Sequence, residues 1–482
     1  MAIEIQYRPQ NPITLKKCGQ KLSESGKIRT GKKSLILRTC TITGLILTMV
    51  FTIMEGLKLS DPFVVYSTLM PFDTFLTITL AWFFYKSPNN GIIGNDLVSV
   101  IIPVYNQKSM IEIVIDAVFK TTYRNIEVIV VNDGSNDGTK EILDKLAKKY
   151  LNLRVIHKKN EGKRRAVAAG FYASTGGYVV LIDSDSIVDK YAISEFMKTF
   201  KADSKIGAAV GHVKVWNAET NIITKCQDAW YDFSFNIGKA AESVFGCVTC
   251  CSGCLAAYRR ETISDFIPYW AEAKVQSSDD REMTMFVISP SKVKSELRLI
   301  FGDKFWVPLS QKLMESMSQY DDSEDRGLTA KALLSWKSVY VASALVYTDA
   351  PENLRGFIKQ QIRWKKGYLR TNFFVNSFFW RKNPLIALKY YTEFMTAFTA
   401  PLITFTLLFY EPIFLQNPLL TASVFGSSLL VGLAQGIDYK MRDPVAKNWK
   451  YKPLMDLIAF HMLSWLLFPV LWGFRDHKWG TR

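Results

Sequence analysis

Two aspartates separated by one residue, Asp183 and Asp185, follow the apolar run Val179 to Ile182. A run of this kind predicts a buried strand, and the carboxyl end of such a strand opens into the crevice where α/β folds bind ligands. Two carboxylates there can hold a divalent ion that prefers hard oxygen ligands, Mg²⁺ or Mn²⁺. Two aspartates in a surface turn would have the same spacing, so it is the preceding strand that favours a metal site.

Two further predicted strands end in polar residues. Val128 to Val131 precedes Asp133 and a glycine turn, and Pro103 and Tyr105 end another apolar run. Asp133 is suited to contact a uracil or ribose, although a simple Asx turn would also place an aspartate there. Because parallel strands end at a common edge, we expect these residues to lie close to Asp183.

Three cations, Lys163, Arg164 and Arg165, follow Gly162 and open a predicted helix. Cations and free amides at a helix start can together bind an anionic diphosphate. Solvated basic residues are the alternative interpretation, but their position between the second strand and the aspartate pair favours binding.

The elements that would position these groups alternate between short β-branched runs and amphipathic segments. Val98 to Val104 and Ile126 to Val131 are predicted strands, and Met110 to Thr121 and Gly138 to Tyr150 are predicted helices. Such alternation is typical of a parallel sheet in an α/β domain.

The flanks of this domain are almost free of charge over long stretches. Leu35 to Met54 and Pro62 to Tyr85 predict two membrane spans, and Ala387 to Tyr410 and Pro418 to Leu433 predict two more. A last run, Leu454 to Leu471, contains Pro469 and has basic flanks on both sides, so we expect a broken or re-entrant element.

The formal charge of the 482-residue chain is +16, and its cations cluster beside the apolar runs, before residue 35 and between residues 440 and 452. This position predicts cytoplasmic flanks and disfavours nucleic-acid binding. Arg, Lys and aromatic residues mix between Leu354 and Phe379, as in helices at a membrane surface.

Four of the seven cysteines, Cys247, Cys250, Cys251 and Cys254, fall within eight residues. A zinc site normally takes its ligand pairs from two separate stretches, so buried thiols are the favoured interpretation.

Five motifs follow one another along the chain: Pro103-Val104-Tyr105-Asn106, Asp133-Gly134-Ser135, Asp183-Ser184-Asp185, Ser323-Glu324-Asp325-Arg326 and Gln360-Gln361-Ile362-Arg363-Trp364. This series resembles the processive family 2 glycosyltransferases, in which QxxRW occurs in cellulose, chitin and hyaluronan synthases. Finer matches resemble the membrane-integrated (class I) hyaluronan synthases: Gly162-Lys163-Arg164, Lys214-Val215-Trp216-Asn217, Cys251-Ser252-Gly253 and the terminal Trp479-Gly480-Thr481-Arg482.

The resemblance implies a GT-A-like α/β domain that transfers sugars from UDP-sugars with inversion. Asp325, between Glu324 and Arg326, would remove the acceptor proton while a metal at Asp183 and Asp185 neutralises the leaving UDP. The substrate-binding residues that it implies are Pro103, Tyr105, Asp133, Lys163, Arg164, Asp183, Ser252, Gly253, Gln360, Arg363, Trp364, Trp479, Thr481 and Arg482. An Arg-Trp pair on an amphipathic helix could also simply anchor at the membrane interface.

The chain departs from the family pattern in one respect, because Asp279-Asp280-Arg281-Glu282-Met283-Thr284 resembles the same acidic motif. Asp325 lies 39 residues before Trp364, close to the interval expected in hyaluronan synthases, whereas Asp280 lies 84 residues before it. We therefore expect Asp325 to be the base and residues 285–322 to be an insertion, which puts the acceptor loops and the product in doubt.

These observations predict a cytoplasmic GT-A-like domain inserted between transmembrane helices, with amphipathic interface helices. The expected divisions are a basic arm (1–34), two spans (35–86), the transferase domain (97–350), interface helices (351–386), a membrane region (387–474) and a cytoplasmic tail (475–482). The chain would be a multi-pass, monomeric protein of the plasma or inner membrane that contacts lipid, UDP-sugars and its growing polysaccharide. Hyaluronan from UDP-GlcNAc and UDP-GlcA is the expected product. The alternatives are a chitin-type synthase, a transferase to a lipid-linked acceptor, and a non-enzymatic scaffold.

Overall fold

The computed structural model describes residues 32–60, 62–272, 278–289 and 336–474. Its centre is an eight-stranded sheet with the order β3-β2-β1-β4-β7-β6-β8-β5. The strands are β1 (Val98–Val104), β2 (Ile126–Asp133), β3 (Leu153–Lys158), β4 (Tyr178–Leu181), β5 (Ile187–Val188), β6 (Ile206–Val215), β7 (Ala256–Arg259) and β8 (Lys337–Thr348).

The first half of the sheet is parallel, as the alternation of strands and helices predicts. β1 pairs in parallel with β2 on one side and with β4 on the other, and β2 pairs in parallel with β3. All seven residues of β1 are buried, which explains its unbroken apolar run. The predicted bounds of β1 are confirmed, and those of β2 and β4 are confirmed to within two residues.

The second half of the sheet is mixed, which the sequence did not indicate. β7 runs antiparallel to both β4 and β6, β8 runs parallel to β6, and β5 is antiparallel to β8. The second half thus combines the parallel pair β6–β8 with antiparallel pairs at β7 and β5.

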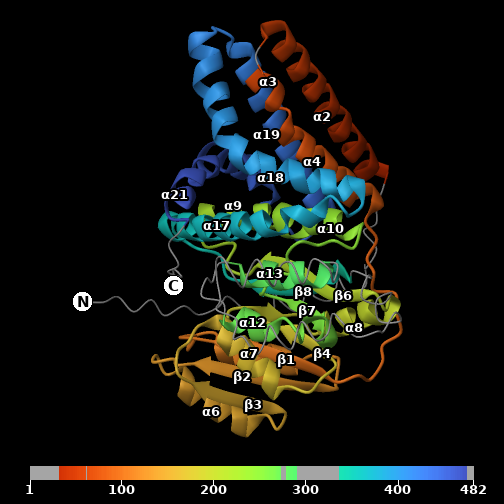
Figure 1. Cartoon of the computed structure of the whole chain (residues 1–482), viewed down its shortest axis with the longest axis vertical. Helices are drawn as coiled ribbons and strands as arrows, with labels where there is room; N and C mark the ends of the chain where they lie inside the picture. Colours follow the sequence, from red (N-terminus) through yellow and green to blue (C-terminus); the bar gives the residue numbers. More distant parts are fainter. Residues whose placement is uncertain (1–31, 61, 273–277, 290–335, 475–482) are drawn as a thin grey trace, which may run out of the picture.

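Helices cover both faces of the sheet (Figure 1). Those of the domain are α5 (Ile111–Phe119), α6 (Thr139–Lys149), α7 (Lys163–Ala173), α8 (Ala192–Ala202), α9 (Ile222–Tyr231), η2 (Asp232–Ile237), α10 (Gly238–Ser243), α11 (Arg260–Ile263), α12 (Ile267–Glu272) and α13 (Asp279–Ile288). The predicted helices α5 and α6 are confirmed, each slightly shorter than expected.

A row of helices separates the sheet from the apolar helices. α17 (Leu354–Phe379), α9 and α10 lie across the molecule between the two layers, and α13 lies between α17 and the sheet (Figure 1). The mixed segment Leu354 to Phe379 is thus one continuous helix.

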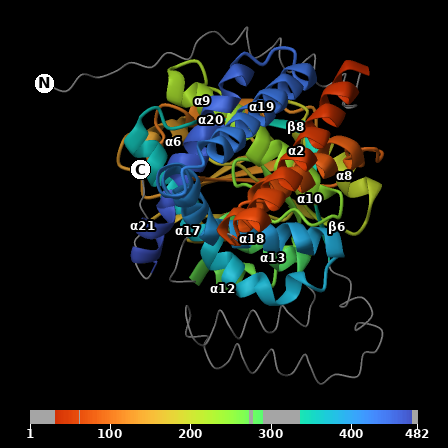
Figure 2. The ribbon, with the colours of Figure 1, turned by 90° about the horizontal axis from the view of Figure 1, so that it is seen from above.

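Five helical segments are long and apolar enough to cross a membrane. They are Lys32–Leu59, Val64–Phe84, Pro384–Phe414, Pro418–Arg442 and Asn448–Trp472. They lie together at the end of the molecule opposite β2 and β3 (Figure 1), and the view from above looks onto that end (Figure 2). They comprise α2 (Lys32–Leu59), α3 (Pro62–Tyr66), α4 (Leu69–Thr79), η1 (Leu80–Phe84), α18 (Pro384–Phe405), η4 (Thr406–Phe414), α19 (Pro418–Arg442), η5 (Asn448–Tyr451), α20 (Lys452–Ile458), η6 (Ala459–Leu463), η7 (Ser464–Leu466) and α21 (Leu467–Trp472).

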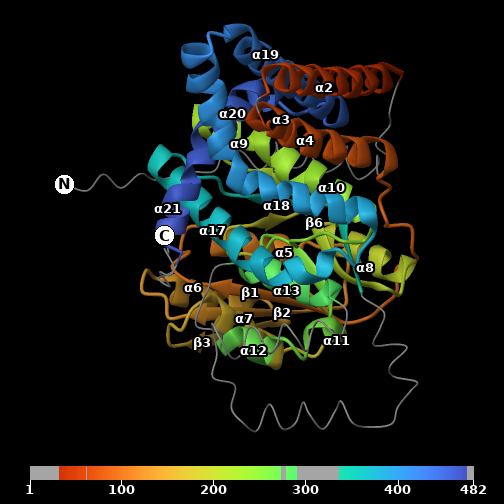
Figure 3. The same cartoon turned by 45° about the horizontal axis from the view of Figure 1, so that its top comes forward.

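The last of these segments is irregular and contacts the middle row at both ends. Near its start, the Asn448 side chain donates to Asp228 of α9 at 3.2 Å. At its other end, Arg370 of α17 donates to the carbonyl oxygen of Phe474, and α21 lies beside α17 (Figure 3). The segment thus begins and ends at the same layer of the molecule.

Buried ion pairs tie the apolar helices to the domain. Arg38 Nε of α2 lies 2.7 Å from Asp438 Oδ1 of α19, and Arg442 pairs with both Asp438 and Asp232 of η2. This chain of alternating charges holds α2, α19 and η2 in a fixed relation, because breaking a buried pair leaves an uncompensated charge.

The cysteine cluster lies beside β7 as free thiols. Burial raises the pKa of Cys251 and Cys254 to about 12, so both stay protonated at neutral pH. Within the described ranges, no group of three or more His, Cys, Asp or Glu side chains is arranged to hold a metal ion.

Candidate active site

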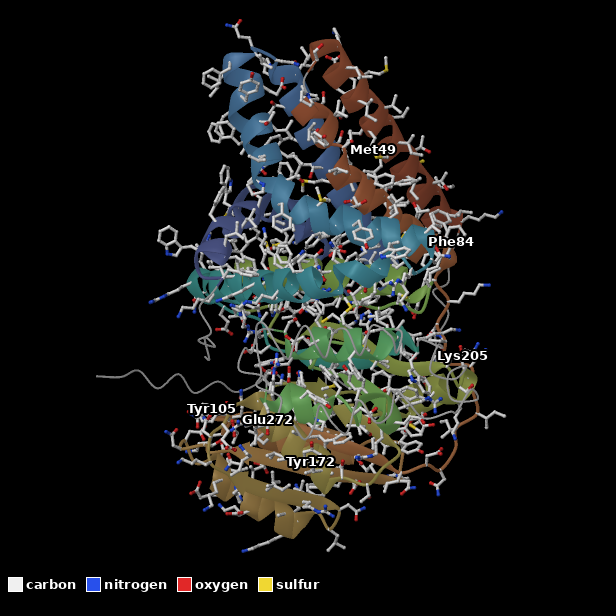
Figure 4. The ribbon with its side chains drawn as sticks, viewed as in Figure 1. Met49, Phe84, Tyr105, Tyr172, Lys205 and Glu272 are labelled. Carbon is white, nitrogen blue, oxygen red and sulfur yellow. The ribbon has the colours of Figure 1, made fainter. Side chains whose placement is uncertain are left out.

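The carboxyl ends of β1, β2 and β4 meet at one edge of the sheet, because these strands are parallel neighbours. Tyr105, directly after β1, lies at this edge, and Lys205, just before β6, lies at the opposite side of the molecule (Figure 4). The loops after β1 and β2 are joined by two hydrogen bonds: Asn106 N–H donates to Ser135 Oγ, and Asn136 N–H donates to Asn106 Oδ1, both at 2.9 Å. The loops after β1 and β2 therefore lie side by side at this edge.

Asp133 at the end of β2 is buried and organises the loop before α7. Its carboxylate accepts hydrogen bonds from the N–H groups of Glu161 and Gly162 and from Lys158 Nζ, at 2.8 to 3.0 Å. Gly162 has a φ of +95°, a conformation that favours glycine. Asp133 thus fixes the start of α7, where Lys163 follows.

Lys163 and Asp183 form the ionic centre of this edge. Lys163 Nζ lies 2.5 Å from Asp183 Oδ1. Burial by itself lowers the pKa of Lys163, but the carboxylates of Asp183, Asp279 and Asp280 outweigh it and raise the pKa above its usual value. Lys163 is therefore a permanent cation beside the aspartate pair.

Arg164 does not have the role that the sequence predicts. Its side chain is 0% exposed and pairs with Asp279 and Glu282 of α13, at 2.5 and 2.9 Å, with its guanidinium over the Trp270 ring. Fully buried and already paired with two carboxylates, it is not open to a diphosphate. Arg164 instead holds α13 against α7.

Gly253 lies between two carboxylates, those of Asp183 and Asp280. Its N–H group lies 3.3 Å from Asp280 Oδ2. A Cβ atom added at Gly253 would lie 3.3 Å from both carboxylate oxygens of Asp183 and 3.1 Å from Lys163 Nζ. The first copy of the duplicated acidic motif thus reaches the site through Asp280, at the amino end of α13.

Ser252, the neighbour of Gly253, accepts a hydrogen bond of 2.5 Å from Lys239 Nζ of α10. Lys239 also lies over the Phe235 ring, 4.7 Å from its centroid. Sequence reasoning missed Lys239, since a single lysine in a helix carries no motif.

Trp364, in the first half of α17, packs into a cluster of aromatic rings. Its ring centroid lies 5.6 to 6.2 Å from those of Trp230, Tyr231 and Phe235, which come from α9 and η2. Burial raises the pKa of the Tyr231 hydroxyl, a hydrogen bond with Gln360 opposes the rise, and the charge of Asp185 adds weakly to it. Tyr231, which sequence reasoning also missed, thus links the QxxRW segment to the aromatic cluster of α9 and η2.

The donor set of Asp183 and Asp185 fits a hard divalent ion. Both side chains follow β4, and their oxygens, with those of a bound diphosphate, are the ligand type that Mg²⁺ and Mn²⁺ prefer. Asp185 also accepts a hydrogen bond from Ser186 at 3.2 Å.

Several predicted site residues lie outside the described residues: Glu324, Asp325, Arg326, Trp479, Thr481 and Arg482. The expected insertion at 285–322 begins inside α13, where Met285, Phe286, Val287 and Ile288 are buried. Its expected first boundary thus falls within a helix of the core.

Residues 99–266 match the family described as Glycosyl transferase family 2. The chain is 29% identical over 422 residues to a protein of Streptococcus pyogenes named hyaluronan synthase, covering 85% of this chain and 88% of that one. It is also 29% identical over 290 residues to an N-acetylglucosaminyltransferase of Rhizobium sp. (strain N33), covering 58% of this chain and 55% of that protein.

A solved structure has a similar fold. The mannosyltransferase PcManGT of Pyrobaculum calidifontis, in complex with GDP-Man and Mn²⁺, aligns with a TM-score of 0.51 and 16% identity, over 86% of this chain and 99% of that one. The sheet and its helices thus form a GT-A-like fold.

Proposed function

Residues 99–266 form a family 2 glycosyltransferase domain, and on this premise we propose that the chain is a membrane-integrated, processive, inverting synthase that polymerises and exports a polysaccharide. The proposed product is hyaluronan, made from UDP-GlcNAc and UDP-GlcA. Similarity to the streptococcal hyaluronan synthase over 85% of the chain supports this product.

The observation that supports the proposal is the aromatic cluster around Trp364. The Trp364 ring offers an apolar face on which a sugar can stack, and it packs beside Tyr231, on which the charge of Asp185 also acts. An acceptor sugar on Trp364 would thus have its end next to a donor held at the aspartate pair.

The donor would bind along the carboxyl edge of the sheet. Pro103, Tyr105 and Asp133 are placed to contact the nucleoside, and Lys163 can move from Asp183 to the diphosphate oxygens. Asp183 and Asp185 would hold Mg²⁺ or Mn²⁺, which neutralises charge on the diphosphate when bound. Trp479, Thr481 and Arg482 are proposed to close over the same group.

Transfer requires removal of one proton from the acceptor. A carboxylate takes the proton of the acceptor hydroxyl, the hydroxyl oxygen forms a bond to the anomeric carbon of the donor, and the bond from that carbon to UDP breaks. Arg363, Trp364 and Gln360 would hold the acceptor while Ser252 and Gly253 line the donor side.

Two residues are candidates for this base. The interval to Trp364 favours Asp325, flanked by Glu324 and Arg326. The geometry favours Asp280, whose carboxylate is bound to Gly253 beside Asp183. We propose Asp280 as the first candidate, because its carboxylate is hydrogen-bonded to Gly253, which lies next to Asp183 and Lys163.

The proposed membrane arrangement has four spans and one re-entrant element. Basic residues before α2 and after α19 favour a cytoplasmic domain. Because Asn448 and Phe474 both contact the middle row, the segment between them is proposed to enter the membrane and return. The tail then stays on the side of the transferase domain.

A chitin-type synthase is the second candidate. The similarity to rhizobial N-acetylglucosaminyltransferases supports a single-sugar product. A transferase to a lipid-linked acceptor is less favoured, because the QxxRW pattern is typical of processive enzymes.

The test is polymer synthesis by the purified protein in lipid with Mn²⁺ and radiolabelled UDP-GlcNAc, with and without UDP-GlcA. Hyaluronidase and chitinase then identify the product. We expect polymer only with both donors and its digestion by hyaluronidase. A chitinase-sensitive polymer made from UDP-GlcNAc alone would show that the chain is a chitin-type synthase. The absence of any polymer would contradict a processive synthase.

A further inference from the structure

The part of the chain that the structure describes contains four buried lysines: Lys214, Lys239, Lys389 and Lys452. Three of them pair with a carboxylate: Lys214 with Asp443, Lys389 with Glu393, and Lys452 with Asp456. Lys239 of α10 is 6% exposed, and none of the described carboxylates forms an ion pair with it. A buried ammonium group without an anion is costly, so its position indicates a role beyond packing.

Two carboxylates of the same region are engaged elsewhere. Glu242, one turn farther along α10, accepts hydrogen bonds from the backbone N–H and the hydroxyl of Thr249, both at 2.9 Å. Asp183 pairs with Lys163. Neither carboxylate is therefore the counter-ion of Lys239.

Three groups on which the charge of Lys239 acts are themselves neutral. Burial raises the pKa of the Cys251 and Cys254 thiols to about 12, and Lys239 opposes the rise. Burial also lowers the pKa of His212 well below its usual value, and Lys239 adds to the fall. These side chains surround the ammonium group with weakly polar groups that carry no compensating charge.

Lys239 also contacts two parts of the candidate site. Its Nζ atom donates to Ser252 Oγ at 2.5 Å. Its ammonium group lies over the Phe235 ring, 4.7 Å from the centroid, and the Phe235 ring lies 5.6 Å from that of Trp364. The cation thus lies between the Ser252-Gly253 segment and the aromatic cluster of the QxxRW helix.

The neighbouring Gly253 lies where the site is open to solvent. A Cβ atom added there would lie 3.1 Å from Lys163 Nζ and 3.3 Å from the Asp183 oxygens. The side chains of Lys163 and Asp183 are 38% and 30% exposed. A ligand that binds at these two residues therefore comes next to Ser252 and its lysine.

We propose that Lys239 recognises the carboxylate of a uronic acid sugar, either in the donor UDP-GlcA or at the end of the acceptor chain. This inference rests on the proposed function and names a residue that determines its sugar specificity. The ammonium group supplies the missing opposite charge, and Ser252 can turn its hydroxyl to donate to the second carboxylate oxygen. The flexible four-carbon stem of lysine allows this movement.

The same pair can also accept a neutral sugar. GlcNAc carries a hydroxymethyl group where glucuronic acid carries its carboxylate, so it would leave the bond between Lys239 and Ser252 in place. A diphosphate fits this position less well, because Lys163 and a metal at the aspartate pair are already placed to neutralise it. Lys239 thus distinguishes the two sugars by charge while one site serves both.

The first test measures UDP release by the full-length protein in lipid, with each donor varied while the other is saturating. Lys239→Met should raise the KM for UDP-GlcA about 10–100-fold, the factor that corresponds to one charge-assisted hydrogen bond, and leave the KM for UDP-GlcNAc within about twofold. Lys239→Arg keeps the charge and should restore most of the difference. Lys190→Met is the matched control, because exposed Lys190 lies over the Tyr191 ring at the same 4.7 Å.

The second test separates the donor from the acceptor. Hyaluronan oligosaccharides that end in glucuronic acid or in GlcNAc are bound to the same variants. Weaker binding of only the glucuronate-ended oligosaccharide to Lys239→Met, with an unchanged KM for UDP-GlcA, would place the recognised carboxylate in the acceptor. A raised KM for UDP-GlcA would place it in the donor.

Two results would overturn the inference. One is an equal rise of both KM values together with weaker binding of UDP, which would assign Lys239 to the diphosphate. The other is a Lys239→Met variant with unchanged KM values and unchanged oligosaccharide binding.

Direct binding of UDP-GlcA and UDP-GlcNAc, measured by calorimetry without turnover, keeps this inference separate from the proposed function. A wild-type protein that makes no polymer but loses its affinity for UDP-GlcA in Lys239→Met would contradict the proposed function and support the role of Lys239.

Discussion

Buried polar side chains are paired at the carboxyl edge of the sheet but lack partners on one ridge of α17, formed by Tyr368 and Asn372 and called the α17 ridge here. At the edge, Arg164 forms ion pairs with two carboxylates, although its Nη2 makes no hydrogen bond, and Lys163 pairs with Asp183. On the ridge, the hydroxyl of Tyr368 and both side-chain polar atoms of Asn372 make no hydrogen bond. At the edge, ion pairs within the protein fix the positions of the charged side chains, which suits chemistry in a fixed geometry. Removing one partner of such a pair is costly, whereas removing a polar atom of the ridge breaks no bond.

The largest expected effect comes from breaking the aspartate pair. Asp183→Asn and Asp185→Asn should each lower sugar transfer by about 10²–10³-fold, because charge on the leaving diphosphate loses its stabilisation. UDP release from the purified variants measures this. Asp144→Asn, an exposed aspartate paired with His157, is the matched control and should retain full activity. Activity retained by both pair variants would place the metal elsewhere.

The next effect concerns the buried ion pairs at the edge. Arg164→Met should destabilise the protein by about 3–5 kcal/mol, because Asp279 and Glu282 lose their buried cationic partner. Thermal unfolding in detergent measures the loss. The adjacent Arg165→Met removes only an exposed pair with Glu161 and should cost less than about 0.5 kcal/mol. Equal losses for the two variants would contradict the anchoring role of Arg164.

The edge should also respond to pH through Glu282. Burial raises its pKa from 4.5 to about 7, and Asp279 adds to the rise while Arg164 opposes it. Between pH 4.5 and 7 the folded protein therefore binds more protons than the unfolded chain, so its stability falls as pH rises through this window, by about 1–3 kcal/mol. Unfolding followed from pH 4.5 to 8 should reveal the slope, and Glu282→Gln should flatten it. An unchanged slope in the variant would assign the dependence to another group.

The smallest effect on stability is expected on the ridge. Asn372→Leu should change the unfolding free energy by less than about 1 kcal/mol, or raise it, because no hydrogen bond is lost and an unsatisfied amide disappears. The same unfolding assay measures it. A loss as large as that of Arg164→Met would mean that Asn372 has a partner in the folded protein, and the contrast between the two regions would disappear.

The parallel half of the domain could be predicted from sequence because its signals are local. β1, α5, β2 and α6 follow from apolar periodicity within single segments. β7 and β5 are short, with four and two residues, and their antiparallel partners are distant in the chain. No local pattern specifies such pairing, so the mixed half was missed.

The site was predictable where a motif ends a strand, as at Asp183 and Asp133. The role of a side chain could not be predicted at positions where that role depends on whether the side chain is buried. Lys163 and Arg164 are neighbours of the same charge, yet α7 turns one toward Asp183 and the other into the core. Asp280 was set aside because of its chain distance from Trp364, but α13 packs its apolar face into the core and thereby brings Asp280 to Gly253.

The identity of the catalytic base tests the proposed site most directly. Asp280→Asn and Asp325→Asn should be compared for UDP release in the presence of both donors and for binding of UDP. The geometry predicts that Asp280→Asn lowers transfer by about 10²–10⁴-fold, the usual contribution of a general base, while UDP still binds. Full activity of Asp280→Asn together with loss of transfer in Asp325→Asn would contradict this site and assign the reaction to the second copy of the motif.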